Sequence, residues 1–326
     1  MTSLFPVAHS VLDVGALADA LAARYAFDGR PVCQLFYRGM NDIYIVHDDK
    51  RRYALRAWRA NWREVSHVIY ETEFLNFLAG QGLPVANTIP ARDGSRYFLV
   101  DVQEGARPIA LFDWADGKKF GAAPREDVAR RIGETFAHLH LKSRSFRPSV
   151  ARLTNPLSDL TDNVPHLMEL VFDRPDDQRD YPRIAKNLAH AMSSLHGRDL
   201  PRGPNHGDFH FNNVHVTPDG RFTLLDFDNA GEDYFLQDLA CYVWANEYGN
   251  YDPVYGTAFL QGYQSVRPFT ADETASLPLL VFAKEFRLIS GFSRHMNSIG
   301  HAPLRFRDLD WFARSIRGRA ATLGLL

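Results

Sequence analysis

Apolar and polar residues alternate along the first third of the chain in the manner of a small antiparallel sheet. Five runs rich in β-branched and aromatic residues, bounded by polar or glycine-containing segments, predict strands at Val32–Tyr37, Ile43–Val46, Tyr53–Trp58, Tyr97–Val102 and Ile109–Trp114. A helical spacing of apolar residues predicts a helix within Val11–Phe27 and a second one, ending at two glycines, over Trp62–Ala79. We therefore expect a five-stranded sheet with one helix inserted between its third and fourth strands.

The pattern becomes helical after Gly117. The predicted helices are Arg125–Ser143, Tyr181–Leu195, Leu236–Glu247, Phe259–Ser265 and Leu277–Ser298. The only convincing strands in this part of the chain are Val214–Thr217 and Phe222–Asp226. The expected architecture is α+β with two lobes, residues 1–114 and residues 115–326.

Composition narrows the class of protein. The chain has 326 residues, of which 45% are hydrophobic and 23% charged, as expected of a soluble globular protein. The formal charge of −2 argues against nucleic acid as a partner. The N-terminal residues do not resemble a secretory signal, no apolar run approaches the roughly 18 residues of a membrane span, and Cys33 and Cys241 are expected to be reduced core residues. These features predict a soluble, cytoplasmic protein without a membrane partner, and they leave its oligomeric state open.

Two carboxylates and an amide have the spacing that phosphoryl transfer requires. Asp208 lies in His206-Gly207-Asp208-Phe209-His210-Phe211-Asn212-Asn213, and Asp226 opens Asp226-Phe227-Asp228 after a β-like stretch. A carboxylate at Asp208 can orient and deprotonate an acceptor hydroxyl. Asn213 and Asp226 supply oxygen ligands that suit Mg²⁺ held against nucleotide phosphates. The pattern predicts a kinase, and the Gly after His206 and the Asp after Phe227 indicate that its acceptor is not a protein.

These motifs resemble the aminoglycoside phosphotransferase and choline kinase superfamily, and the layout is most similar to homoserine kinase type II and the stress-response kinase A group. The resemblance extends from about residue 30 to about residue 300. It implies a bilobal, protein-kinase-like fold with a nucleotide-binding lobe at residues 1–114 and a catalytic and acceptor-binding lobe at residues 115–326. It also implies ATP and Mg²⁺, and a small hydroxylated acceptor such as an amino alcohol, homoserine or an aminoglycoside. The preference for ATP over GTP stays open.

The resemblance also assigns supporting residues in the second half of the chain. His206 and His210 belong to the motif and would shape the loop around Asp208. Asp238, in Gln237-Asp238-Leu239-Ala240, would brace that loop by hydrogen bonds. Asp228 has two open assignments, a contact to the metal or a contact to the substrate.

A cation in the first lobe aligns with a known phosphate-binding position. Tyr53-Ala54-Leu55-Arg56 resembles the V-A-I-K strand of kinases, with Arg56 in place of Lys. The resemblance assigns Glu71, on the following helix, as the partner of Arg56. Glu73 is the competing partner, and an exposed strand cation beside a solvated acidic helix face is the alternative interpretation.

Four more residues are candidates for nucleotide binding by resemblance. Gly39 and Asn41 lie between two predicted strands, where the family covers the nucleotide phosphates. Phe112 and Trp114 fall where the chain crosses between lobes, a region that contacts the adenine edge in the family. A simple β-core role is the alternative for both aromatic residues.

The acceptor is constrained by charge. A basic face of the last predicted helix carries Lys284, Arg287 and Arg294, and it favours an anionic or zwitterionic acceptor if it lines the site. A solvated basic face is the alternative. Glu232, Asp233 and Glu247 are acidic candidates for binding an amine.

Two other functions remain open at this level. A protein kinase of the stress-response kinase A type is the first, although the eleven residues between Asp226 and Asp238 leave no room for a long activation segment. The second is a pseudokinase scaffold that binds nucleotide without turnover. Its support is Arg56 in place of Lys, and the intact Asp208, Asn213 and Asp226 argue against it.

Overall fold

The computed structural model describes residues 5–154, 157–300, 304 and 306–326. The chain forms two compact units. The first comprises Met1–Gly117, Phe146–Arg152 and Thr217–Asp228, and the second comprises Lys118–Ser145, Leu153–Val216 and Asn229–Leu326. Two short segments from later in the sequence therefore fold with the N-terminal part of the chain.

The first unit contains a five-stranded antiparallel sheet. Its strands are β1 (Val32–Arg38), β2 (Asn41–His47), β3 (Arg52–Trp58), β4 (Phe98–Val102) and β5 (Gly105–Asp113). Their spatial order is β1-β2-β3-β5-β4, with an irregularity in β1 between Leu35 and Tyr37. All five predicted strands are present, and β5 begins earlier than its apolar run suggests because Gly105–Pro108 continue the pairing with β4.

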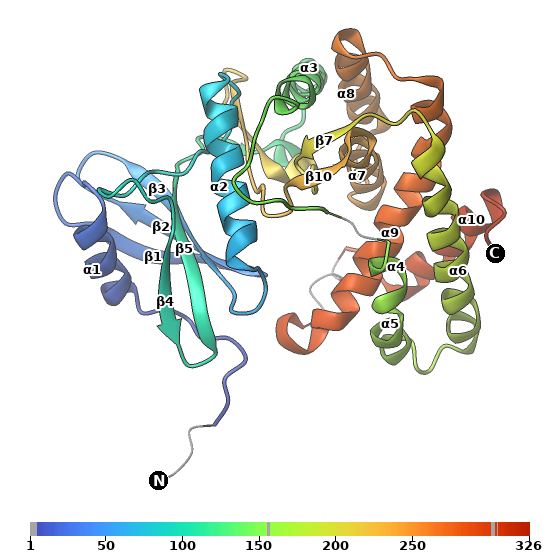
Figure 1. The fold of residues 1–326 in the computed structure, drawn as a ribbon, viewed down its shortest axis with the longest axis horizontal. Coiled ribbons are helices and arrows are strands. Elements are labelled where there is room, and N and C mark those ends of the chain that lie inside the picture. The colour runs from blue at the N-terminus through green and yellow to red at the C-terminus, as the bar shows by residue number, and fades with distance from the viewer. Residues whose placement is uncertain (1–4, 155–156, 301–303, 305) are drawn as a thin grey trace. The chain divides into compact units, whose positions relative to one another are not determined.

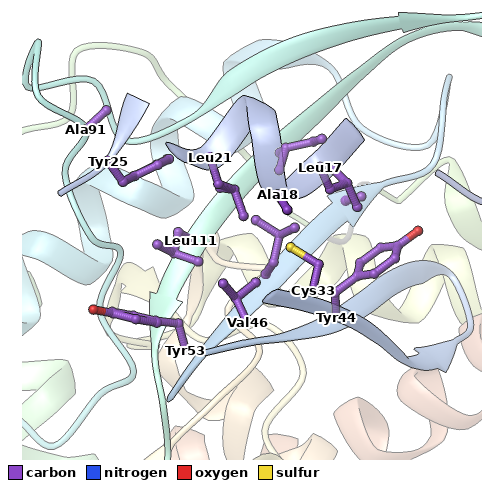
Figure 2. Packing of buried hydrophobic residues seen from close by; sticks show 13 residues of the cluster. Leu17, Ala18, Leu21, Tyr25, Cys33, Tyr44, Val46, Tyr53, Ala91 and Leu111 are labelled. Atoms are coloured by element: carbon purple, nitrogen blue, oxygen red, sulfur yellow. The ribbon is translucent and has the colours of Figure 1, made fainter. Parts of the chain in front are cut away.

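Helix α1 (Val14–Arg24) covers one face of this sheet (Figure 1). Leu17, Leu21 and Tyr25 pack against Val46 and other apolar side chains of the strands (Figure 2). Because successive side chains of a strand point to opposite faces, the apolar strand residues that contact α1 share one face of the sheet. The side chain of Arg56 in β3 lies on the other face. The α1 core thus provides a rigid support for the face that carries the cation.

Helix α2 (Val65–Gly80) organises the remainder of the first unit. Phe146 lies 5.0 Å, centroid to centroid, from Phe74 of this helix, and Phe227 lies 6.0 Å from the same ring. Strand β9 (Phe222–Leu224) is attached through two backbone hydrogen bonds, from Leu224 N to Pro84 O and from Ala86 N to Leu224 O. These contacts carry the Asp226-Phe227-Asp228 segment into the first unit.

The second unit is mainly helical. Its α-helices are α3 (Glu126–Ser143), α4 (Asp159–Asp162), α5 (Val164–Leu170), α6 (Pro175–Ser193), α7 (Phe235–Tyr248), α8 (Pro253–Val266), α9 (Ala271–Ile299) and α10 (Leu309–Thr322). Helices α3 and α8 approach so closely that a Cβ at Gly133 would lie 2.0 Å from Phe259 O, and one at Gly262 would lie 2.0 Å from Arg130 O. Only glycine permits this backbone contact.

Short β elements of the second unit lie around the His206–Asn213 motif. Strand β6 (Lys118–Lys119) pairs with β8 (Val214–Val216), and β7 (Arg202–Asn205) pairs antiparallel with β10 (Gly231–Tyr234). The prediction that only the two runs flanking the motifs form strands is therefore wrong. Sequence propensity misses β7 and β10 because Arg-Gly-Pro-Asn and Gly-Glu-Asp-Tyr contain strand-disfavouring residues, so tertiary pairing decides their conformation.

The predicted fold class is confirmed: a five-stranded antiparallel sheet with helices in one unit, and a mainly helical second unit. Within the described ranges, no helix is long and apolar enough to cross a membrane.

Candidate active site

The loop between β7 and β8 holds Asp208 and Asn213 in the second unit. His210 caps the short 3₁₀ helix Phe211–Asn213 by accepting from Asn212 N. Asn213 Nδ2 donates to Asp208 O at 3.0 Å. The amide of Asn213 is thus oriented by the backbone of Asp208, and its Oδ1 is the atom of this side chain that could serve as the predicted metal ligand.

Asp238 braces this loop from the first turn of α7. Its Oδ2 accepts from His206 N at 2.8 Å, and its Oδ1 accepts from Gly207 N at 2.7 Å. The carboxylate is fully buried, and the two donors are consecutive backbone amides. The structure therefore places Asp238 in the bracing position that the motif implies.

A buried polar chain extends from Asp238 to the start of α9. His140 Nε2 lies 3.0 Å from Asp238 Oδ2, and His140 Nδ1 lies 2.7 Å from the Tyr263 hydroxyl. Arg267 donates to that hydroxyl at 3.1 Å and to Glu273 at 2.7 Å. Burial lowers the pKa of His140, so a neutral ring donates from Nε2 to Asp238 and accepts from Tyr263. The sequence reveals His140 only as a core residue and carries no signal for Tyr263 or Arg267.

Gly207 occupies a position that excludes a side chain. Its φ is +81°, and a Cβ there would lie 2.0 Å from Asn229 O. The glycine of His-Gly-Asp is therefore required by the close approach of the chain that follows Asp228.

Asp208 presents a charged and partly open carboxylate. Lys284 Nζ donates to its Oδ1 at 2.7 Å, and Cys241 Sγ lies 3.4 Å from the same oxygen. The side chain of Asp208 is 29% exposed. Burial alone would raise the pKa of this carboxyl, but Lys284 and His210 lower it well below its usual range. Asp208 is thus ionised and accessible, as an acceptor-orienting group must be.

The first unit holds Arg56, Glu71 and Asp226 together. Arg56 Nη1 donates to Glu71 Oε1 at 2.7 Å, and Arg56 Nη2 donates to Asp226 Oδ1 at 3.0 Å. Glu73 instead accepts from Ser149, which decides between the two candidate partners in favour of Glu71. Arg56 is buried, so the alternative of an exposed strand cation is wrong.

Burial and nearby charge set the protonation of this group. Burial opposes the charge of Arg56, but Glu71 and Asp226 raise its pKa above the usual value. Burial raises the pKa of Glu71 to about 7 against the opposing effect of Arg56, and Asp228 and Asp226 also raise it. Asp226 follows β9 with a φ of +61°, a left-handed conformation uncommon outside glycine.

Asp228 is surrounded by donors of the first unit. Trp58 Nε1 donates to its Oδ1 at 2.7 Å, while Trp62 Nε1 and the Arg63 guanidinium donate to its Oδ2 at 2.9–3.1 Å. Arg152 also donates to Asp228 O at 2.8 Å. Both carboxylate oxygens are engaged, which favours neither of the two predicted roles, a metal contact or a substrate contact. The sequence missed this cluster because nothing in its spacing links Trp58 to residue 228.

The four remaining nucleotide candidates lie on the sheet of the first unit or at its end. Gly39 N donates to Asn41 O in the turn between β1 and β2, and Gly39 O accepts from Arg59 at 2.9 Å. Phe112 is buried on β5, with its ring centroid 5.0 Å from the Arg56 guanidinium carbon. Trp114 follows β5, half-buried, with the Arg52 guanidinium 4.9 Å from its ring centroid. Phe112 is thus the one of the four that touches Arg56.

The acceptor candidates separate by burial. On α9, Lys284 and Arg287 are enclosed and Arg294 is exposed, so a uniformly solvated basic face is wrong. Asp233 is buried, whereas Glu232 is exposed on the same strand β10. Burial lowers the pKa of Arg287 against the opposing effect of Asp233 and Asp159. The second unit therefore holds a buried cation near two carboxylates.

The donor set suits a hard cation bound mainly by non-protein oxygens. Asn213 offers an amide oxygen, and Asp226 keeps a carboxylate that is 48% exposed while Arg56 holds one of its oxygens. Across the residues with assigned positions, no group of three or more His, Cys, Asp or Glu side chains could hold a metal by itself. Mg²⁺ commonly binds through one or two protein oxygens plus phosphates, and Asn213 in the second unit and Asp226 in the first unit each offer an oxygen of that kind.

Comparison with known protein families shows the family to which this chain belongs. The sequence pattern of the phosphotransferase enzyme family matches residues 38–273, a range that contains Arg56, Asp208 and Asp226 but not Lys284, Arg287 or Arg294 of α9. The chain belongs to this family. It is a small-molecule kinase that transfers a phosphoryl group to an alcohol.

Relatives of this phosphotransferase come from several bacteria. An uncharacterised protein of Deinococcus radiodurans is 32% identical over 286 residues, covering 86% of this chain and 82% of that protein. A homoserine kinase of Rhizobium etli is 28% identical over 262 residues, covering 78% of each chain. Among solved structures, the amicoumacin kinase hAmiN in complex with AMP-PNP, Ca²⁺ and Ami has the same fold, with a TM-score of 0.72, 16% identity and coverage of 96% of this chain and 93% of that one.

Proposed function

We propose that this kinase uses ATP and Mg²⁺ to phosphorylate the hydroxyl of a small amino alcohol or hydroxy amino acid, with Asp208 as the residue that orients the acceptor. The observation that carries the proposal is the state of Asp208: an ionised, partly exposed carboxylate on a loop braced by Asp238 and tied to Asn213.

Asp208 would act mainly by alignment. The acceptor hydroxyl donates a hydrogen bond to the carboxylate, which directs an oxygen lone pair at the γ-phosphorus. The new P–O bond forms as the bond to the ADP oxygen breaks, and the hydroxyl proton passes to Asp208. Because Lys284 and His210 keep the pKa of Asp208 low, proton transfer comes late and orientation is the larger contribution.

The charged residues of the first unit suit the triphosphate. Arg56 is held by Glu71 and Asp226, so its guanidinium is fixed before a nucleotide binds. Asn213 and Asp226 would hold Mg²⁺, which neutralises charge on the β- and γ-phosphates when bound. Gly39 and Asn41 would cover the phosphates, and Phe112 and Trp114 would lie near the base.

Charge supports a zwitterionic acceptor. Arg287 is a buried cation that suits a carboxylate, and Asp233 is a buried acid that suits an ammonium group. A relative 28% identical to this chain is named a homoserine kinase, and homoserine is a zwitterionic hydroxy amino acid. Arg294 and Glu232 are more exposed and would contribute from the surface.

The test is ADP release from Mg-ATP across a panel of acceptors: homoserine, serine, threonine, choline, ethanolamine, simple sugars, aminoglycosides and a generic protein substrate. We expect acceptor-dependent release with a hydroxy amino acid or amino alcohol, and a loss of about 10²-fold or more in Asp208→Asn with ATP affinity retained. Asp173→Asn, at an exposed position of the second unit, is the matched control. Turnover of Asp208→Asn at the wild-type rate would contradict the role of Asp208, and release only with the protein substrate would contradict the acceptor class.

A further inference from the structure

Lys284 differs from the other cations of α9 in what its charge contacts. Its side chain is 14% exposed, and its ammonium lies 2.7 Å from Asp208 Oδ1. Arg287, one turn later, is near Asp233 and Asp159 instead. The ammonium of Lys284 is therefore directed at the proposed catalytic carboxylate and is largely shielded from solvent.

The two oxygens of Asp208 have different surroundings. Oδ1 receives Lys284 and lies 3.4 Å from the Cys241 sulfur. Oδ2 lies 3.9 Å from His210 Nε2, which is beyond hydrogen-bond range. One oxygen is thus held by α9 and α7, and the other remains able to accept a hydrogen bond from a ligand.

A buried ion pair of this kind is a poor device for stability alone. Removing two charges from water costs about as much as their attraction returns, and a pair of apolar residues of similar volume is often as stable. The pKa of Lys284 is nevertheless raised, because Asp208 and Cys241 outweigh the effect of burial. Both partners are charged, at a carboxylate whose orientation matters for the reaction.

We propose that Lys284 is a positioning residue for phosphoryl transfer: it fixes Asp208 through Oδ1 so that Oδ2 is presented to the acceptor hydroxyl. This inference rests on the proposed function and adds to it a residue, 76 positions along the chain, that acts through Asp208. It assigns the ammonium to the enzyme's own carboxylate and leaves recognition of an acceptor carboxylate to Arg287.

A double-mutant cycle tests this role directly. Wild type, Lys284→Met, Asp208→Asn and the double variant are compared in kcat and in KM for ATP and for the acceptor found in the panel above. We expect Lys284→Met to lower kcat about 10-fold or more, with KM for ATP within about twofold of wild type. In the Asp208→Asn background the same change should cost less than about twofold, because Lys284 has no remaining carboxylate to position.

Two further variants separate positioning from folding. Lys284→Arg keeps a cation of similar reach and should recover part of kcat, whereas Lys186→Met, at an exposed position of α6, should leave turnover unchanged. If Lys284→Met does not fold, the comparison of Lys284→Arg with Lys284→Gln in both Asp208 backgrounds replaces it. The inference would be overturned if the losses in kcat of the two single variants multiplied in the double variant, or if the acceptor KM rose with kcat unchanged. Either result would indicate that Lys284 binds a ligand directly.

Failure of the inference can be told from failure of the proposed function. If wild type turns over none of the acceptors, the proposed function fails, and the pair is then tested by the melting temperatures of the same four proteins. Coupling between the two substitutions would support positioning of Asp208 by Lys284, and additive shifts would overturn it.

Discussion

Arg56 Nη1 lies 2.7 Å from Glu71 Oε1 in the interior of the first unit, while the second terminal nitrogen of the same guanidinium reaches Asp226. The planar guanidinium of an arginine can donate hydrogen bonds to two carboxylates at once, which the ammonium of a lysine does less well. The residue that replaces the usual lysine is therefore suited to hold a helix carboxylate and a metal-ligand candidate together.

Substituting Arg56 should weaken nucleotide binding in graded fashion. We expect Arg56→Met to raise the Kd for ATP about tenfold or more, and Arg56→Lys to give an intermediate value because one of the two contacts is lost. Isothermal titration calorimetry with an ATP analogue measures both, with Arg30→Met, at an exposed ion pair, as the control. Equal affinity in Arg56→Met and wild type would remove Arg56 from the nucleotide site.

Glu71 should make stability depend on pH in a defined direction. Its pKa is about 7 in the folded protein against an ordinary value of 4.5, so the folded state binds this proton more tightly than the unfolded chain. The stabilisation associated with the proton is complete below about pH 4.5 and is lost as pH rises through about 7. Glu71→Gln cannot ionise, so its melting temperature relative to wild type should increase between pH 5 and pH 8, by an amount equivalent to about 1–3 kcal/mol. Parallel melting curves across that range would contradict the prediction.

Asp228 should contribute to stability and not to metal affinity. Asp228→Asn leaves the indoles of Trp58 and Trp62 and the guanidinium of Arg63 with one fewer anionic acceptor, and we expect a loss of about 2–4 kcal/mol in the free energy of unfolding. The concentration of Mg²⁺ that gives half-maximal turnover should stay near that of wild type. In Asp226→Asn it should rise instead, with a smaller loss of stability. A raised Mg²⁺ requirement in Asp228→Asn at unchanged stability would make its carboxylate a metal contact.

Removing the brace at Asp238 should loosen one loop in particular. In Asp238→Ala the amides of His206 and Gly207 lose their acceptor, and His140 keeps Tyr263 but loses its other partner. Hydrogen exchange at those two amides should accelerate, and turnover should fall about 10-fold or more. Asp252→Ala, which removes an exposed helix cap at Val254 N, should cost about 1 kcal/mol without changing turnover. Unchanged exchange at His206 and Gly207 would show that the loop does not depend on Asp238.

The sequence predicted those elements and motifs that are determined by residues close together along the chain. The five strands, α2 and the Asp208–Asn213 motif follow from periodicity and spacing, and the family resemblance selected Glu71 as the partner of Arg56. The β7–β10 pair and the short helices α4 and α5 were not predicted, because weak local propensity is decided there by tertiary contacts.

The sequence also did not predict polar contacts between residues far apart along the chain. Lys284 with Asp208, Trp58 with Asp228, and His140 with Tyr263 join residues 76 to 170 positions apart. Each member looks ordinary in its own segment: a helix cation, a strand aromatic, a core histidine. Only the folded structure shows which of these polar groups form hydrogen bonds with one another.

The steric closure at Gly207 bears on how such an enzyme can be controlled. In protein kinases the corresponding position of the H-R-D pattern is an arginine. Arginine can bind a phosphate group attached to a nearby segment. Here any side chain would collide with the Asn229 carbonyl, so no cation can be installed at this position without displacing the chain after Asp228. Evolution of a phosphorylation switch through this position would require rebuilding the loop.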